Sequence, residues 1–286
     1  MTVLVRTERW ADEKPLGPVE IDWANPLTAG LVGLWLVNEG AGAVRDLVHG
    51  LDGVLTGNAA WGAGFDGRFV QCPGTTADYI DIPNSPIHDI LYTLTAGVIF
   101  TPRALNFSSY QGIWRRGATT DASGPSNINW MIQGKSATSI LQSAVKTDTA
   151  INDYVNSSYN LTQDVSSHAT TTINISEALL TLIVDGTKDT LALTGSPTQI
   201  AGGATKTWLG RRAGGAVDAD IHLAYVLERD WAEEEIREYQ IAPYQILKPR
   251  KRAYYYFPAA GTPLFMHNKS LNGLGSGGPF FHNPLG

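Results

Sequence analysis

Apolar and polar residues alternate in short runs along most of the chain, and turn-forming residues separate the runs. In residues 30–37 the alternation has a period of two, which places Leu34 and Leu36 on one face of a strand and Trp35 and Val37 on the other. The 30 glycines and 15 prolines fall between such runs, which is typical of a β-sandwich or barrel. Further strands are predicted at residues 69–72, 79–82, 91–100, 111–115, 127–133, 170–175, 179–184, 189–193, 207–210 and 220–227.

The strands at residues 30–37 and 220–227 are predicted to be the first and last strands of one sandwich. This prediction joins residues 27–242 into a single domain. Residues 1–26 then form an extended N-terminal arm, in which residues 19–23 alternate like an edge strand, and residues 243–286 form a C-terminal tail. Residues 136–167 are rich in Ser, Thr and Asn, and they are compatible with exposed strands or with a disordered insertion.

One helix is predicted, at residues 231–241. Asp230 is a natural N-cap, Glu233 follows three residues later as in a capping box, and Pro243 ends the helix. Trp231, Ile236 and Tyr239 share one face of it. The fold class is therefore all-β with one short C-terminal helix.

Composition excludes several classes of protein. The net charge of −6 argues against general nucleic-acid binding. Cys72 is the single cysteine, so no internal disulfide forms. No apolar run approaches the ~20 residues of a membrane helix, and residues 1–10 lack the apolar stretch expected of a signal peptide.

Four stretches, in order along the chain, carry a family resemblance: residues 30–40, 46–57, 78–84 and 218–236. They resemble the opening strand, the loop after it, the Tyr-Ile-x-Ile-Pro strand and the closing strand with its acidic helix in the laminin-G-like, concanavalin-A-like jelly roll. The resemblance covers residues 27–240 and implies a jelly-roll β-sandwich. The flanks at residues 17–28 and 243–252 resemble those of tailed-bacteriophage proteins that carry this domain. They imply a location in the virion, which is assembled in the cytoplasm of a bacterial host.

The carboxylates of the chain are its candidates for catalytic chemistry. Retaining glycosidases of this fold carry a Glu-x-Asp-x-x-Glu run, which sets two carboxyl groups about 5.5 Å apart. Asp218 and Asp220 share a face, but Ile221-His222-Leu223-Ala224 follows where the third carboxylate belongs. No catalytic residue is predicted. His222 is interpreted as a hydrogen-bonded packing residue rather than a ligand.

Calcium is the one ion that the sequence suggests, although no cofactor is required by the predicted role. Members of this fold bind calcium through Asp side chains and backbone carbonyls at one edge of the sandwich. Asp46 and Asp52 match the loop concerned, and Asp218 or Asp220 could approach it. The alternative is that these aspartates make Asx turns. Five aromatic residues are candidates for carbohydrate contact or for the core: Trp61, Trp114, Trp130, Tyr154 and Tyr159.

The C-terminal tail has three parts that suit attachment to a partner. A basic run contains Lys248, Arg250, Lys251 and Arg252, and an aromatic run follows at Tyr254, Tyr255, Tyr256 and Phe257. Two similar apolar motifs, around Leu264 and Phe265 and around Phe280 and Phe281, are joined by a Gly-rich spacer. Two anchors on a flexible linker raise the effective affinity for a partner without a large interface.

These features favour a non-enzymatic structural protein of a bacteriophage particle. We expect a capsid decoration or cement protein that displays a lectin-like sandwich and is anchored by its arms to the major capsid protein or to tail and connector proteins. The alternative is a tail-associated adhesin that binds a receptor or a host-surface glycan. A glycoside hydrolase is the third hypothesis, and neither a membrane nor nucleic acid is an expected partner.

Overall fold

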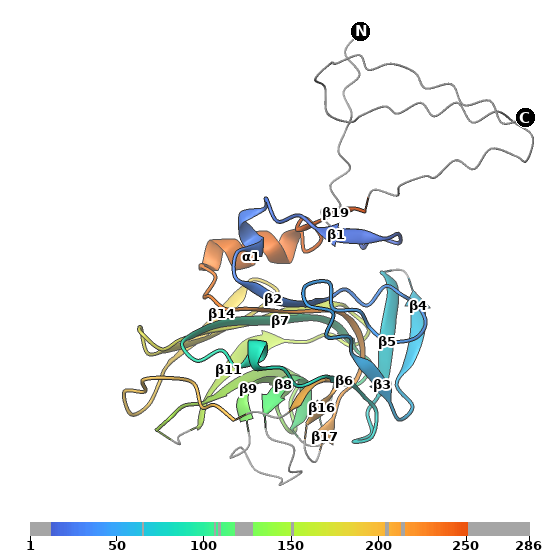
Figure 1. The fold of residues 1–286 in the computed structure, drawn as a ribbon. Coiled ribbons are helices and arrows are strands. Elements are labelled where there is room, and N and C mark those ends of the chain that lie inside the picture. Colours follow the sequence, from blue (N-terminus) through green and yellow to red (C-terminus); the bar gives the residue numbers. More distant parts are fainter. Residues whose placement is uncertain are drawn as a thin grey trace, which may run out of the picture. The chain divides into compact units, whose positions relative to one another are not determined.

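The computed structural model describes residues 13–64, 66–105, 107, 110–117, 128–149, 152–203, 206–212 and 215–250. In this part of the chain two largely antiparallel sheets pack face to face, and helix α1 (Glu233–Ile241) lies on the outer face of one of them (Figure 1). The prediction of an all-β sandwich with one short helix is confirmed.

The nine-stranded sheet forms the layer remote from α1. Its strands are ordered β11 (Asn152–Asn160), β10 (Ile140–Lys146), β9 (Ile128–Gly134), β8 (Gln111–Gly117), β15 (Lys206–Leu209), β6 (Tyr79–Ile82) and β3 (Val54–Thr56), with β16 (Arg211–Arg212) and β17 (Gly215–Ala216) beside β8. The eight-stranded sheet is ordered β14 (Thr187–Ala192), β13 (Leu179–Val184), β12 (Ser167–Asn174), β7 (Thr93–Pro102), β18 (Asp218–Leu227), β5 (Gly67–Pro73) and β4 (Ala60–Gly64), with β2 (Leu31–Trp35) beside β18.

The predicted pairing of the two distant strands is confirmed. β2 runs antiparallel to β18, with Trp35 opposite Ala224 and Leu34 opposite Tyr225. Trp35 and Val37 belong to the core between the sheets, whereas Leu34 and Leu36 belong to a second apolar layer on the outer face of the eight-stranded sheet. The alternation in residues 30–37 therefore separates two buried faces rather than a buried face and a solvated one.

The two interpretations of residues 136–167 are resolved in favour of strands. β10 and β11 form one edge of the nine-stranded sheet and pair with each other in antiparallel register. In β11 buried residues alternate with more exposed ones, as expected for a strand with one solvated face.

Aromatic residues dominate the centre of the core. Trp35, Trp114 and Trp130 form an edge-to-face chain with ring centroids 5.5 and 5.2 Å apart. All three are fully buried. Of the two alternatives for Trp114 and Trp130, carbohydrate contact or core, the structure supports the core, because both rings fill the space between the two sheets.

Helix α1 begins later than predicted, and Asp230 is not its N-cap. The N-cap is Ala232, whose N–H donates to Glu235 Oε2 at 2.9 Å. Asp230 instead accepts a hydrogen bond from the Asn174 side chain. Trp231, Ile236 and Tyr239 are buried together against the eight-stranded sheet, although Trp231 precedes the helix whose face it was predicted to share.

The flanks of the predicted domain are packed on the sandwich as far as the structure describes them, which corrects the predicted boundaries. β1 (Val19–Ile21) pairs antiparallel with β19 (Leu247–Pro249), and the chain divides into units after Arg250 rather than at residue 242. The aromatic and apolar tail motifs from residue 251 onward lie outside the described residues.

Candidate functional site

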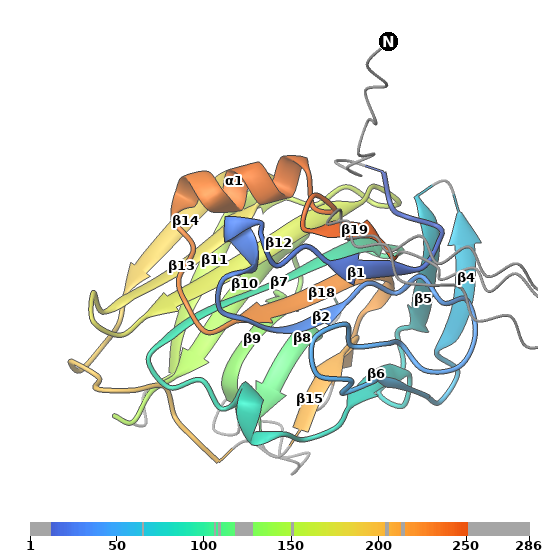
Figure 2. The same cartoon turned by 45° about the horizontal axis from the view of Figure 1, so that its top comes forward.

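The two ends of the described chain meet on one side of the sandwich. In the β1–β19 pair Val19 lies opposite Pro249, and the Arg250 N–H donates to Pro18 O at 3.1 Å. Figure 2 shows this pair beside α1, over the eight-stranded sheet. The N-terminal and C-terminal flanks therefore leave the domain from the same side.

A second apolar layer holds these flanks in place. Ile21 and Leu27 from the N-terminal flank and Tyr244, Ile246 and Leu247 from the C-terminal flank are all buried in it. The layer lies between α1 and the outer face of the eight-stranded sheet, where it includes Leu34, Leu36 and Leu223. Each buried side chain of this size contributes about 1.5–3 kcal/mol, so the flanks are structural parts of the domain.

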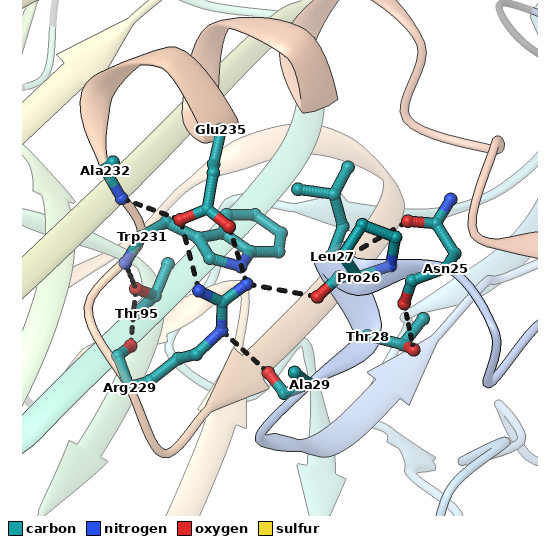
Figure 3. A network of polar contacts seen from close by, with 10 residues as sticks. All are labelled: Asn25, Pro26, Leu27, Thr28, Ala29, Thr95, Arg229, Trp231, Ala232 and Glu235. Atoms are coloured by element: carbon teal, nitrogen blue, oxygen red, sulfur yellow. Dashed lines mark hydrogen bonds and ion pairs between the residues drawn. The ribbon is translucent and has the colours of Figure 1, made fainter.

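Arg229 joins the N-terminal flank to the helix (Figure 3). Its guanidinium donates to both carboxylate oxygens of Glu235, at 2.8 and 3.1 Å, and to the backbone carbonyls of Ala29 at 2.8 Å and Pro26 at 3.3 Å. The Thr95 hydroxyl donates to Arg229 O at 2.7 Å and accepts from the Trp231 N–H at 2.9 Å. We call Arg229, Glu235 and the two carbonyls the clasp.

The flank that the clasp holds contains a short 3₁₀ turn, η1 (Pro26–Thr28). Asn25 is its N-cap and accepts the Leu27 N–H at 3.0 Å. An Asn-Pro pair is a recognisable turn signal, so the sequence could have indicated η1. Arg229 itself carries no such signal, because its two carbonyl acceptors come from a segment some 200 positions earlier.

Two predicted partner-binding residues, Lys248 and Arg250, lie at the β1–β19 pair, on this side of the sandwich. They line a cleft of about 380 Å³ together with Arg45 and Trp23. Trp23 is 58% exposed, and the Lys248 ammonium is 3.7 Å from carboxylate oxygens of both Glu20 and Asp22. The remaining predicted partner residues, from Lys251 onward, lie outside the described residues.

Asp46 organises the loop between β2 and β3. Its two carboxylate oxygens accept four backbone N–H groups, from Leu34, Val48, His49 and Leu51, at 3.0–3.1 Å. Asp52 Oδ1 accepts the N–H of Asp46 at 2.9 Å. These contacts are those of the Asx-turn alternative, in which the carboxylate oxygens satisfy backbone donors.

Asp218 and Asp220 lie on β18, at the other predicted metal position. Asp220 Oδ2 is 2.5 Å from the Arg103 guanidinium and the residue is buried. Burial raises the pKa of both carboxyl groups, and Arg103 opposes that shift. Among the described residues there is no group of three or more His, Cys, Asp or Glu side chains placed to hold a metal ion. Calcium binding through these four aspartates stays a prediction without geometric support.

His222 is the hydrogen-bonded packing residue that the sequence indicated. Its Nε2 is 2.9 Å from the Thr101 hydroxyl, and its ring packs edge-on against Phe69. The residue is buried, and burial lowers the pKa of the imidazole to about 3.

The outer face of the nine-stranded sheet carries a second group of polar and aromatic side chains. Ile80 and Leu209 belong to the core, so their neighbours Tyr79, Asp81 and Trp208 point outward. Trp208 Nε1 donates to Asp81 Oδ1 at 3.1 Å. The Arg211 guanidinium lies 4.6 Å from the Tyr79 ring centroid, and both Arg115 and Arg211 lie 5.1 Å from that of Trp208. Guanidinium groups over rings of this kind make favourable cation–π contacts.

Comparisons with known proteins bear on the fold. Neither a family model nor a curated protein matches the sequence. Among solved structures, the binding domain of Paraclostridial mosquitocidal protein 1 matches with a TM-score of 0.56 and 16% identity over 74% of this chain and 52% of that one. The binding domain of botulinum neurotoxin DC in complex with rat synaptotagmin II matches with a TM-score of 0.55 and 14% identity, over 73% of this chain and 50% of that one. The Trypanosoma rangeli sialidase in complex with the inhibitor DANA matches with a TM-score of 0.53 and 14% identity, over 76% of this chain and 33% of that one.

The chain therefore spans between a third and about half of the length of these solved structures. At such low identity the likeness concerns the β-sandwich fold alone. Function must be argued from the sites of this chain, because one sandwich architecture supports many unrelated roles.

Proposed function

We propose that this protein is a non-enzymatic binding and structural module of a bacteriophage particle, attached through its flanking segments and displaying its sandwich outward. The observation that carries the proposal is the β1–β19 pair, which brings both flanks to the side of α1. The nine-stranded sheet lies on the opposite side (Figure 1). A domain tethered on one side presents its other side to the surroundings.

The composition of the C-terminal flank supports attachment to another virion protein. Lys248 and Arg250 begin a basic run that continues into Lys251 and Arg252, on a chain whose net charge is −6. A local basic segment on an acidic protein suits an acidic protein partner, by charge complementarity. The flanks resemble those of tailed-phage proteins, and we favour a capsid decoration role with the major capsid protein as the partner. No cofactor is needed for this role.

A tail-associated adhesin is the alternative, and the outer face of the nine-stranded sheet favours it. This face carries the half-buried Tyr79, Asp81, Lys206 and Arg211 around the buried Trp208, and these four side chains offer a ring and hydrogen-bonding groups that suit a glycan or protein receptor. The binding domain of botulinum neurotoxin DC, solved in complex with rat synaptotagmin II, gives a precedent for this fold in a binding protein. A glycan array distinguishes the two roles, since a decoration protein gives no specific signal and an adhesin gives one that Arg211→Ala removes.

The arrangement of Asp218 and Asp220 supports a non-enzymatic role. A retaining glycosidase needs one carboxylate free to act as nucleophile and a second as acid. Here the Asp220 carboxylate is paired with Arg103. Leu223, which takes the position of the last carboxylate in the glycosidase run, is buried in the second apolar layer. We expect no turnover on a panel of polysaccharides and sialosides. Hydrolysis that is lost in Asp220→Asn would overturn this part of the proposal.

Cross-linking mass spectrometry on purified particles tests the attachment. A lysine-reactive reagent should join Lys248 to the major capsid protein. Cross-links to a tail or connector protein would reassign the protein to the tail of the particle and would still support attachment through the flanks. Cross-links confined to this chain in intact particles would contradict attachment through the flanks.

A further inference from the structure

A groove of about 680 Å³ opens on the outer face of the eight-stranded sheet. Its floor contains Ile99 from β7, His168 from β12 and His222 from β18. The N-terminal flank, the turn of the β4–β5 hairpin and the C-terminal end of α1 form its walls. Figure 2 shows the hairpin at the edge of the sheet and α1 lying over its face. A groove of this volume is large enough for several side chains of a partner.

The groove carries an excess of negative charge. Glu13, Asp66 and Asp185 line it, and Lys14 is the one Lys or Arg among the described residues that do so. The Lys14 ammonium is already engaged, because it donates to the carbonyls of Val37 at 2.9 Å, Arg68 at 2.6 Å and His222 at 2.7 Å. Burial lowers the pKa of Lys14 to about 7, so even this charge is partly lost at neutral pH.

The two histidines in the floor are neutral at neutral pH and do not offset the acids. Burial lowers the pKa of both imidazoles to about 3. His168 Nε2 is engaged with the Tyr225 hydroxyl at 3.0 Å, and His222 Nε2 with Thr101. The Nδ1 atom of each ring is buried and has no hydrogen-bond partner in the part of the chain that the structure describes. Buried polar atoms of this kind are normally satisfied, and these two belong to residues that line the groove.

Apolar side chains line the groove beside the acids. Leu16 and Ile241 are each 77% exposed, and they are the two most exposed large apolar residues among those described. Two bulky aliphatic side chains held in solvent at one groove mark a surface for an apolar contact. The N-terminal flank lines this groove, so the groove lies on the same side of the sandwich as the β1–β19 pair (Figure 2).

We propose that this groove binds a basic peptide segment of a partner protein, with lysine or arginine side chains directed to Glu13, Asp66 and Asp185 and aliphatic side chains packed against Leu16 and Ile241. The complementarity is of both charge and polarity. The inference rests on the proposed function only in placing that partner in the particle. The binding chemistry itself depends on the groove alone.

Fluorescence anisotropy with two labelled peptides tests the chemistry. One peptide has eight residues with alternating arginine and leucine, and its twin has glutamate in place of each arginine. The basic peptide should bind the full-length chain, more weakly as salt is added, and the acidic twin should not. Failure of the basic peptide to bind, or equal binding of both, would overturn the proposal.

Neutralising the groove identifies the site. In the triple variant Glu13→Gln, Asp66→Asn and Asp185→Asn the affinity should fall about tenfold, as expected for three partly exposed ion pairs. Asparagine suits position 185, where φ is 46° and the side chain also accepts the His168 N–H. The control is Glu234→Gln, an acid of α1 that does not line the groove. An unchanged affinity in the triple variant would refute the assignment.

A blocking experiment does not depend on these carboxylates. Ile241→Cys places a thiol at the groove, and Glu234→Cys places one elsewhere on the helix. Cys72 is buried with its thiol pKa raised to about 12, so the new thiol is the one that maleimide-polyethylene glycol modifies. Modification at position 241 should abolish peptide binding, and modification at 234 should leave it. Binding that survives the block would place the peptide elsewhere. If the unmodified chain does not bind the basic peptide but is still attached to particles, this inference fails and the proposed function stands.

Discussion

The clasp around Arg229 can be tested by removing one side chain. Arg229→Ala deletes a two-point ion pair with Glu235 and two hydrogen bonds to the carbonyls of Ala29 and Pro26. Both ionic side chains are partly exposed, at 27% and 30%, so the ion pair contributes about 1 kcal/mol. Each charge-assisted hydrogen bond to a carbonyl contributes about 1 kcal/mol, because water replaces part of it. The expected loss in the free energy of unfolding is therefore about 3 kcal/mol.

For a domain of this size that loss lowers the melting temperature by roughly 6–12 °C. The matched control is Arg237→Ala, which removes an exposed pair between positions 233 and 237 of the same helix. Pairs of that kind contribute about 0.5 kcal/mol. Thermal unfolding followed by circular dichroism measures both variants against the wild type.

The pH dependence provides a second check on the clasp. Burial raises the pKa of Glu235, but hydrogen bonds from Arg229 and the Ala232 N–H outweigh it, and the net pKa lies below the ordinary 4.5. A depressed carboxyl pKa stabilises the fold above the unfolded-state pKa and loses that contribution as the pH falls through the folded-state value. The gap between wild type and Arg229→Ala should narrow below pH 4.5. A gap no larger than that of Arg237→Ala at pH 7 would refute the clasp.

Three further predictions concern packing, acid stability and calcium. A Cβ at Gly97 would lie 2.1 Å from the buried Tyr225 hydroxyl, so Gly97→Ala should cost about 3 kcal/mol in urea unfolding, while Gly17→Ala, with open space around it, should cost far less. The His168 pKa is about 3 in the folded state and about 6.5 in the unfolded state, so the unfolded state binds more protons between these two values. The free energy of unfolding therefore decreases as the pH is lowered through this range, and His168→Gln should make that decrease smaller. Because backbone N–H groups occupy both carboxylate oxygens of Asp46, millimolar calcium should not change the melting temperature, and a clear rise would restore the predicted site.

The alternation of apolar and polar residues predicted which strand faces the side chains lie on. The period of two in residues 30–37 gave the correct faces for Leu34 and Trp35, and the pairing of β2 with β18 followed from two good strands at the ends of one domain. The alternation could not show that both faces are buried, because that depends on α1 and the flanks covering the outer side of the sheet.

The candidate sites depended on contacts that the sequence does not encode locally. Asp46 is compatible with calcium or with a turn, and the outcome depends on where the backbone N–H groups of residues 34–51 point. The proline-rich N-terminal flank indicated an extended arm, but the burial of Ile21 and Leu27 requires the C-terminal flank beside them. The residues that line the groove come from seven separate segments of the chain, so no local sequence motif indicates it.

Attachment through the tail is the central claim, and a chain that ends at Arg250 tests it most directly. The proposed function places the gene in a phage genome, where it is replaced by one that encodes residues 1–250 and so retains the β1–β19 pair and both apolar layers. The account predicts that the purified fragment has the melting temperature of the full chain and that it is missing from particles. Particles that carry the fragment at the full-length level would contradict it.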